Sequence, residues 1–320
     1  MSIHAVKREQ ANLAWDNSIP PVLTISSGST VHFSCLDASN GQLNPTSTNA
    51  SIAALKLELC DQVNGPVYVE GAAPGDTLQV DVLDVKTADW GWTALIPGFG
   101  LMTDEFPEPA IKIWDLTEQT VNSVGEVEKY AYLNKDRRIR VPLRPFAGEM
   151  GVARGERGAW STIPPYVTGG NLDTKHLTKG ATLYLPVEVD GALFAIGDGH
   201  AAQGDGEVCG TAIETPMEVT VRLTVRKDKP YTKTPHFRTV TPQTNAEEYY
   251  CTTGIDTDIR EATRSAVRNM IAYLAAEHGL DQVEAYMLCS VAGDLKMHEV
   301  VDMPNYVIGM MIPKSVLGGI

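Results

Sequence analysis

Short segments in which apolar and polar residues alternate run through most of this 320-residue chain, and they constrain its fold more than any other feature. Gly75–Val82 and Glu218–Val225 show the period of two that is typical of a strand with one buried face. Thr182–Val189 and Ala192–Ile196 flank Asp190-Gly191, a dipeptide that favours the tight turn of a β-hairpin. Helical periodicity is scarce before residue 255. The sequence therefore predicts a mainly β fold.

A glycine followed two residues later by a threonine introduces three of these segments, at Gly28–Val31, Gly75–Leu78 and Gly180–Leu183. The unequal spacings of 47 and 105 residues exclude a solenoid. Two interpretations remain open. The phrase marks two related β-sandwich units, or it is simply a common way to enter a strand.

The C-terminal part has a different pattern. An apolar stripe recurs at helical spacing from Asp258 to His278, Asp258 and Glu261 resemble a capping box, and Gly279 is a favourable helix stop. A second helix is expected over Asp281–Val291, and strands are expected over Lys296–Val301 and Tyr306–Met310. We therefore expect an N-terminal β-rich unit (residues 1–140), a central β unit with the candidate site (141–254) and a C-terminal α+β segment packed on the β body (255–320).

The charge balance excludes several classes of partner. The chain carries 26 basic and 40 acidic side chains, a net charge of −14 with neutral histidines, which disfavours binding to nucleic acid or anionic lipid. Its five cysteines are an odd number without a Cys-x-x-Cys pair, which does not suggest a secreted disulfide scaffold. No segment resembles a signal peptide or reaches the ~18 apolar residues of a membrane span. We expect a cytoplasmic protein.

The densest polar phrase follows an apolar strand and covers Gly197–Glu207. In an extended chain Asp198 and His200 point to one side, as do Asp205 and Glu207. Because crowded carboxylates repel one another, a divalent cation would resolve their conflict, and mixed nitrogen and oxygen ligands suit zinc or a similar metal. The alternative is an acidic, glycine-rich turn in solvent.

Three further phrases offer polar groups beside glycines. Gly169-Gly170-Asn171 allows close backbone approach, Asn171 and Asp173 share a side, and the Asn171 amide offers both a donor and an acceptor to an amide substrate. Asp37 follows a strand and is a further acidic candidate, and Glu149 between glycines is a candidate general base. For each of these phrases, an ordinary turn or surface loop is the simpler interpretation.

Other catalytic chemistries find less support. The chain has no Gly-x-Ser-x-Gly nucleophile elbow, no phosphate loop and no dinucleotide fingerprint. Cys209 lies two residues after Glu207 and remains a possible nucleophile, although a small buried cysteine is the simpler interpretation.

Taken together, these phrases resemble the acetamidase/formamidase family over nearly the whole chain. The most specific matches are Gly197–Glu207 and Gly169–Asp173, supported by Trp15-Asp16-Asn17, Asp37–Gln42, Gly65–Gly71, Arg144–Gly151 and Ser290–Leu295. The resemblance implies hydrolysis of short aliphatic amides to a carboxylic acid and ammonia. It also implies a mainly β fold with jelly-roll-like β-sandwich units, a divalent metal (zinc or calcium) and a homodimer or larger homo-oligomer.

We therefore predict a metal-assisted amidase. Its metal ligands are predicted to be Asp37, Asp173, Asp198, His200 and Asp205, and the metal acidifies its bound water. Glu149 or Glu207 takes the water's proton and returns it to the leaving ammonia, with His200 also counted as catalytic. Asn171, or the backbone N–H groups of Gly169 and Gly170, bind the substrate and stabilise the oxyanion.

Two alternatives stay open at this point. One is hydrolysis of a lactam or another larger C–N substrate at the same site. The other is a non-catalytic β-rich protein that binds a small polar ligand.

Overall fold

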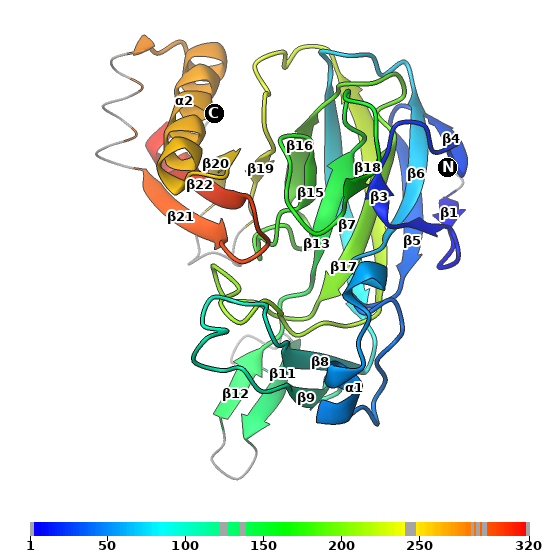
Figure 1. Ribbon diagram of the computed structural model, residues 1–320. Coiled ribbons are helices and arrows are strands. Elements are labelled where there is room, and N and C mark those ends of the chain that lie inside the picture. The colour runs from blue at the N-terminus through cyan, green and yellow to red at the C-terminus, as the bar shows by residue number, and fades with distance from the viewer. Residues whose placement is uncertain are drawn as a thin grey trace.

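Two face-to-face β-sheets form the body of the protein, as the computed structural model of the chain shows (Figure 1). The structure describes residues 3–121, 127–134, 139–240, 248–282, 285, 289 and 293–317. The larger sheet has nine strands, in the order β1 (His4–Val6), β5 (Ser29–Cys35), β18 (Met217–Arg226), β7 (Thr77–Thr87), β16 (Thr182–Pro186), β19 (His236–Arg238), β20 (Tyr249–Asp256), β22 (Tyr306–Pro313) and β21 (Asp294–Glu299).

The smaller sheet has six strands. Its order is β15 (Gly169–Asn171), β13 (Phe146–Val152), β17 (Phe194–His200), β6 (Val63–Glu70) and β2 (Ala11–Asn12), with β4 (Leu23–Ser26) also paired to β6. Shorter ribbons are β8 (Trp90–Leu95) with β9 (Ala110–Asp115), β3 (Ala14–Trp15) with β14 (Trp160–Ser161), and the sheet of β10 (Gln119–Val121), β11 (Val127–Asn134) and β12 (Ile139–Pro142). The helical segments are α1 (Asn49–Ala53), η1 (Leu57–Leu59), α2 (Ile259–His278) and η2 (Lys314–Leu317).

The main hydrophobic core lies between these two sheets. Alternate residues of β5 and β18 face it from the larger sheet, and Phe33 of β5 meets Phe194 of β17 edge-on with ring centroids 5.9 Å apart. A smaller apolar cluster around Trp15 and Ala195 packs against the smaller sheet. Because both sides are covered, every residue of β13 and β17 is buried, and polar side chains on these strands are withdrawn from bulk water.

The C-terminal strands β20, β22 and β21 continue the larger sheet, and α2 packs against β20 and β22 (Figure 1). The Asp258 carboxylate caps α2 by accepting hydrogen bonds from the backbone N–H groups of Arg260 and Glu261, and Gly279 ends it in the left-handed conformation with φ 66°. The predicted helix is thus confirmed. Most of the second predicted helix, Asp281–Val291, lies outside the described residues.

The hairpin prediction at Asp190-Gly191 is wrong. β16 pairs with β7 and β19 in the larger sheet, whereas β17 pairs with β13 and β6 in the smaller one. The turn therefore carries the chain from one sheet to the other. Its positive φ values fall on Gly191, Ala192 and Leu193, so Asp190 does not supply one.

The mainly β fold with a smaller α+β part is confirmed. The three strands introduced by the glycine–threonine phrase, β5, β7 and β16, all belong to the larger sheet, and Gly28, Gly75 and Gly180 have φ near 90°. The division of the chain at residues 140 and 254 stays a prediction, and each large sheet contains strands from more than one of these parts.

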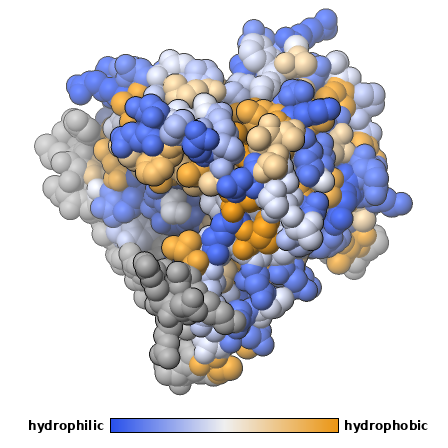
Figure 2. Space-filling view, turned by 60° about the horizontal axis from the view of Figure 1, so that its bottom comes forward, coloured by the Kyte–Doolittle hydropathy of each residue, from blue (hydrophilic) through white to orange (hydrophobic). Residues whose placement is uncertain are grey.

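Hydrophilic residues surround the apolar ones on the face shown in Figure 2. No described helix has the length and apolar composition needed to cross a bilayer.

Candidate active site

A buried cluster of carboxylates surrounds the imidazole of His200 at the end of β17. His200 is only 2% exposed, and its Nε2 lies 2.9 Å from Asp198 Oδ2 and 3.0 Å from Glu214 Oε2. Its Nδ1 lies 2.9 Å from Gln203 Oε1 and 3.7 Å from Asp173 Oδ1. The cluster therefore combines one imidazole with several carboxylate oxygens on neighbouring strands and loops.

The hydrogen bonds of Gln203 define which imidazole nitrogen faces the carboxylates. The amide nitrogen of Gln203, Nε2, donates to the backbone carbonyl of Asp173 at 2.6 Å. The amide oxygen of Gln203, Oε1, is therefore the atom that accepts a hydrogen bond from His200 Nδ1–H. In the neutral imidazole the lone pair then lies on Nε2, toward Asp198 and Glu214. A lone pair facing two carboxylates is repulsive, and either a proton or a metal cation at Nε2 removes that conflict.

Several oxygens of this cluster lack hydrogen-bond donors. Within the part of the chain that the structure describes, both carboxylate oxygens of Glu149 and of Asp173, and Oδ1 of Asp198, are buried without a donor. Buried polar atoms are normally hydrogen-bonded, so a group of unpaired anionic oxygens indicates a site for a cation or a donor ligand.

The electrostatics follow from burial and crowding. Burial raises the pKa of Glu149, Asp173 and Glu207 well above the usual range, and neighbouring carboxylates add to the effect. Burial also raises the pKa of Glu214, to about 7. Burial opposes the charge on His200, but Asp198 and Glu214 prevail and raise its pKa well above the ordinary value.

Gly148 in β13 makes room for this cluster. A Cβ at this position would overlap the carboxylates of Asp198 and Asp173 and the ring of His200. The glycine thus allows three polar side chains to converge against the backbone of β13.

Backbone strain is also concentrated here. Asp61, Asp173, Asp198 and Glu207 have φ values of 55°, 41°, 53° and 45°, in the left-handed region that residues with a Cβ seldom adopt. Such strain persists where the surrounding structure enforces it, and it clusters at functional sites. Four acidic residues of one cluster sharing this conformation support a functional origin for it.

The cluster opens into a small pocket of about 70 Å³. Its polar lining consists chiefly of Asp61, Asn171, Asp173, Asp198, His200, Glu207, Glu214 and Asp302. Trp92, Ile96 and Phe99 are among its apolar walls, and none of its described lining residues is a lysine or arginine. The pocket therefore suits a small polar molecule and a cation.

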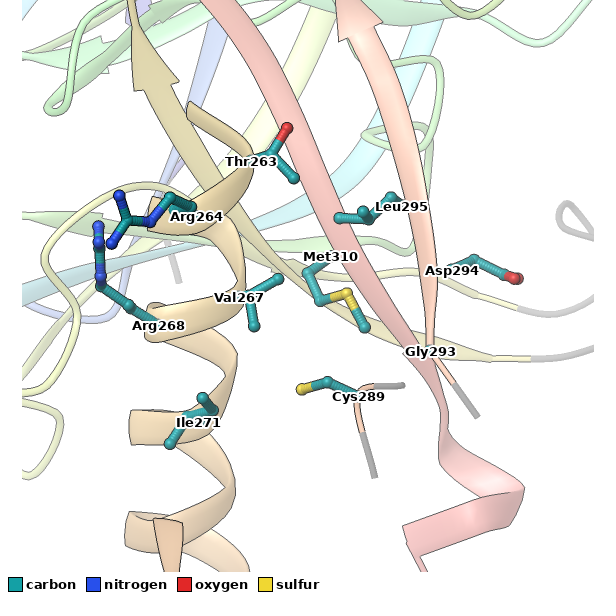
Figure 3. Close-up of a pocket in the computed structure, with 10 residues that line it drawn as sticks. All are labelled: Thr263, Arg264, Val267, Arg268, Ile271, Cys289, Gly293, Asp294, Leu295 and Met310. Atoms are coloured by element: carbon teal, nitrogen blue, oxygen red, sulfur yellow. The ribbon is translucent and has the colours of Figure 1, made fainter. Parts of the chain in front are cut away.

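A larger cavity of about 680 Å³ lies elsewhere, between α2 and the strands β21 and β22 (Figure 3). Val267, Ile271, Met310 and Leu295 contribute apolar walls, and Arg264 and Arg268 of α2 are also among the lining residues. Its described lining contains a single carboxylate, Asp294, and no imidazole. It lacks the groups needed for acid–base or metal chemistry, so the smaller pocket is the better candidate.

The structure brings five of the sequence-predicted site residues together in this pocket: Asn171, Asp173, Asp198, His200 and Glu207. Glu149 is fully buried on β13 behind it and is not among the residues that line it. The functional roles assigned to all of these residues stay predictions.

The other two predicted metal ligands, Asp37 and Asp205, are not among the residues that line the pocket. Asp37 Oδ1 accepts hydrogen bonds from Trp92 Nε1 at 3.0 Å and from the backbone and side chain of Ser39, so donors already surround it. Asp205 pairs with Lys175 Nζ at 2.9 Å and belongs to a separate group with His176 and His298.

The predicted glycine contacts are also different in the structure. The backbone N–H of Gly169 donates to the carbonyl of Tyr166 at 2.9 Å, so it is already engaged. A Cβ on Gly170 would approach Trp15 Nε1 to 3.1 Å. Neither glycine lines the pocket, and both permit the close packing of β15.

The sequence analysis did not predict four residues of the site: Asp61, Gln203, Glu214 and Asp302. Gln203 lies inside the Gly197–Glu207 phrase, so its amide was an available signal. The backbone of Glu214 forms isolated antiparallel β-bridges with His200 and with Trp92. Asp302 lies on the connection between β21 and β22 and lines the pocket from there. No local pattern marks these last two positions.

Comparison with known proteins identifies the family. The sequence profile of the Acetamidase/Formamidase family matches residues 2–157 and 152–318, so the chain belongs to this family. A formamidase of Methylophilus methylotrophus is 29% identical over 96% of this chain and 89% of its own length. An acetamidase of Mycolicibacterium smegmatis is 30% identical over 62% of each chain.

A solved structure shares the fold. The crystal structure of an acetamidase from Bacillus halodurans matches with a TM-score of 0.86 and 30% identity, covering 98% of this chain and 99% of that one. The resemblance inferred from the motifs is therefore confirmed.

Proposed function

We propose that this protein is a hydrolase that cleaves a short linear amide, such as formamide or acetamide, to a carboxylate and ammonia with the help of a divalent metal. Family membership and relatives named formamidase and acetamidase support the reaction class. The observation that carries the proposal is the small pocket in which one imidazole meets several buried carboxylates.

The size of the pocket favours a small substrate. Its volume is about 70 Å³. A single water needs roughly 10 to 15 Å³ of such space, so the pocket accepts a molecule of a few heavy atoms. The volume is therefore compatible with a short linear amide.

The donor set fits a divalent cation. Donor atoms that share one zinc ion at usual bond lengths lie roughly 3 to 3.5 Å apart, and His200 Nε2 lies 2.9 Å from Asp198 Oδ2 and 3.0 Å from Glu214 Oε2. We assign the metal to these three residues, with Asp173 as a further ligand. When bound, a divalent cation supplies Lewis acidity that polarises a carbonyl group and acidifies water.

Glu207 is the residue proposed to move the proton. It lines the pocket, its carboxylate lies 3.9 Å from His200 Nε2, and burial raises its pKa. A carboxylate with a raised pKa accepts a proton from the attacking water and returns it to the leaving nitrogen. Glu149 lies outside the pocket lining, and burial raises its pKa, so it is assigned a supporting role beside the ligands.

We further propose that the metal is zinc, that the protein forms a homodimer and that it is located in the cytoplasm. Mixed imidazole and carboxylate ligands support zinc, with calcium as the alternative. Cys35, Cys60, Cys209, Cys251 and Cys289 are all free thiols, which suits a reducing compartment.

The test measures ammonia release from formamide and acetamide by the purified protein, before and after chelation and after addition of zinc or calcium. Chelation and His200→Ala are expected to abolish the release. His32→Ala is the matched control, since His32 also pairs with a carboxylate at 2.9 Å (Glu218) but lies outside the pocket. Glu207→Gln is expected to lower kcat more than Glu149→Gln does.

Full activity after chelation and in His200→Ala would refute the mechanism. Saturable binding of an amide without ammonia release would instead support the non-catalytic alternative.

A further inference from the structure

Asn171 has only one hydrogen-bonding atom left for a ligand. It ends β15, is 5% exposed and lines the pocket. Its Nδ2 donates to the backbone carbonyl of Ile163 at 3.0 Å and to Asp302 Oδ2 at 2.9 Å. A carboxamide nitrogen carries two hydrogens, so both are used within the protein.

The orientation of the Asn171 amide follows from these partners. The Ile163 carbonyl can only accept a hydrogen bond, so the nitrogen and not the oxygen of Asn171 faces it. Oδ1 is buried and has no donor among the described residues. Asn171 therefore keeps one unpaired acceptor at the pocket wall and has no N–H left for an oxyanion.

Among the atoms of an amide undergoing hydrolysis, a lone acceptor matches the nitrogen. The carbonyl oxygen gains negative charge and needs donors, whereas the NH₂ group carries the hydrogens and departs as ammonia. The other polar lining groups are mainly carboxylates, which are needed for the cation and the proton.

We propose that Asn171 is the residue that selects a primary amide, by accepting a hydrogen bond from the substrate NH₂ group through Oδ1, and that Asp302 positions it. This inference rests on the proposed amide hydrolysis and replaces the oxyanion role that the sequence suggested for Asn171. Asp302 lies on a connection 131 positions further along the chain, and its Oδ2 accepts one of the two Nδ2 hydrogens of Asn171. The selectivity of the pocket is therefore set partly by the C-terminal part of the protein.

The test compares acetamide with methyl acetate, which share an acyl group but differ in the presence of N–H. Asn171→Ala is expected to lower kcat/KM for acetamide at least tenfold more than for methyl acetate. An oxyanion donor, or a residue of merely structural importance, would affect both substrates equally, and that result would overturn the proposal. If the ester is not turned over, both compounds are tested as competitors of formamide hydrolysis. Asn171→Ala should then weaken inhibition by acetamide alone.

Asn64 provides a matched control. It is buried, its Nδ2 donates to the carbonyls of Lys7 and Arg8, and its Oδ1 also lacks a described donor, but it lies outside the pocket lining. Asn64→Ala is expected to lower thermal stability and to leave the amide-to-ester ratio unchanged. A change in the ratio equal to that of Asn171→Ala would count against the proposal.

Asp302 is tested by rescue. Asp302→Ala frees Nδ2 and is expected to lower the amide-to-ester ratio, whereas Asp302→Asn keeps an acceptor oxygen and is expected to restore it. Equal ratios in both variants and the wild type would refute the positioning role. Absence of amide hydrolysis in the wild-type, metal-loaded protein would refute the proposed function itself, so the two failures are distinguishable.

Discussion

Gly148 lies in β13 at a point where any side chain would strike the site. The change Gly148→Ala adds a Cβ that would overlap the carboxylates of Asp198 and Asp173 and the ring of His200. The side chains of Asp173, Asp198 and His200 are buried in close-packed surroundings. To avoid the added Cβ, they would have to move apart from one another. Overpacking of this kind costs about 1 to 3 kcal/mol. For a chain of 320 residues that corresponds to a fall in Tm of about 2 to 5 °C.

The effect on activity is expected to be much larger than the effect on stability. A displacement of roughly 1 Å at a reacting centre can cost about a hundredfold in rate, and the 2.9 Å contact between His200 and Asp198 leaves little tolerance. We expect at least a hundredfold loss of kcat/KM for acetamide, with weaker retention of metal. Ammonia release, elemental analysis and calorimetry measure the three quantities.

Gly204→Ala is the matched control for this substitution. Gly204 lies in the same glycine-rich phrase as the site residues, and a Cβ there would meet nothing within 4 Å. It is expected to leave activity and metal content unchanged. Wild-type activity in Gly148→Ala would refute the view that the cluster needs the space above this glycine.

Two further predictions concern stability. His236 is buried, and burial lowers its pKa to about 3. In the unfolded chain the imidazole binds a proton below about pH 6.5. The stability that neutral His236 contributes is therefore present above pH 6.5 and is lost as the pH falls toward 3. Between pH 7 and pH 5 this loss is about 2 kcal/mol, so urea unfolding of His236→Gln should show a shallower decline than the wild type, and equal slopes would contradict the argument. Asp258→Ala removes the two hydrogen bonds that cap α2 and should lower the free energy of unfolding by about 1 kcal/mol. Asp258→Asn, which still offers an acceptor oxygen, should lose less, and equal losses would exclude a capping role.

Much of the local structure is predictable from the sequence because it depends on neighbours along the chain. A period of two predicted β7 and β18, and the cap and stop residues predicted α2 from Ile259 to His278. Asp198 and His200, two positions apart on β17, do meet, as the alternation of a strand suggested.

Partners distant in sequence depended on the tertiary structure. The apolar segments on either side of Asp190-Gly191 entered different sheets, because strand pairing is selected by the faces that each segment buries and not by the turn alone. Asp205 shares the acidic phrase with His200 but pairs with Lys175, a partner 30 positions away that the phrase itself does not indicate.

The sequence by itself determined the local strands, the capped helix and the acidic phrase around His200, because each depends on residues within a few positions of one another. Only the tertiary structure placed Glu214 against His200 and Asp302 against Asn171. Such contacts join segments whose separation in the chain is unrelated to their separation in space, and sheet pairing and burial, which local periodicity does not encode, bring them together.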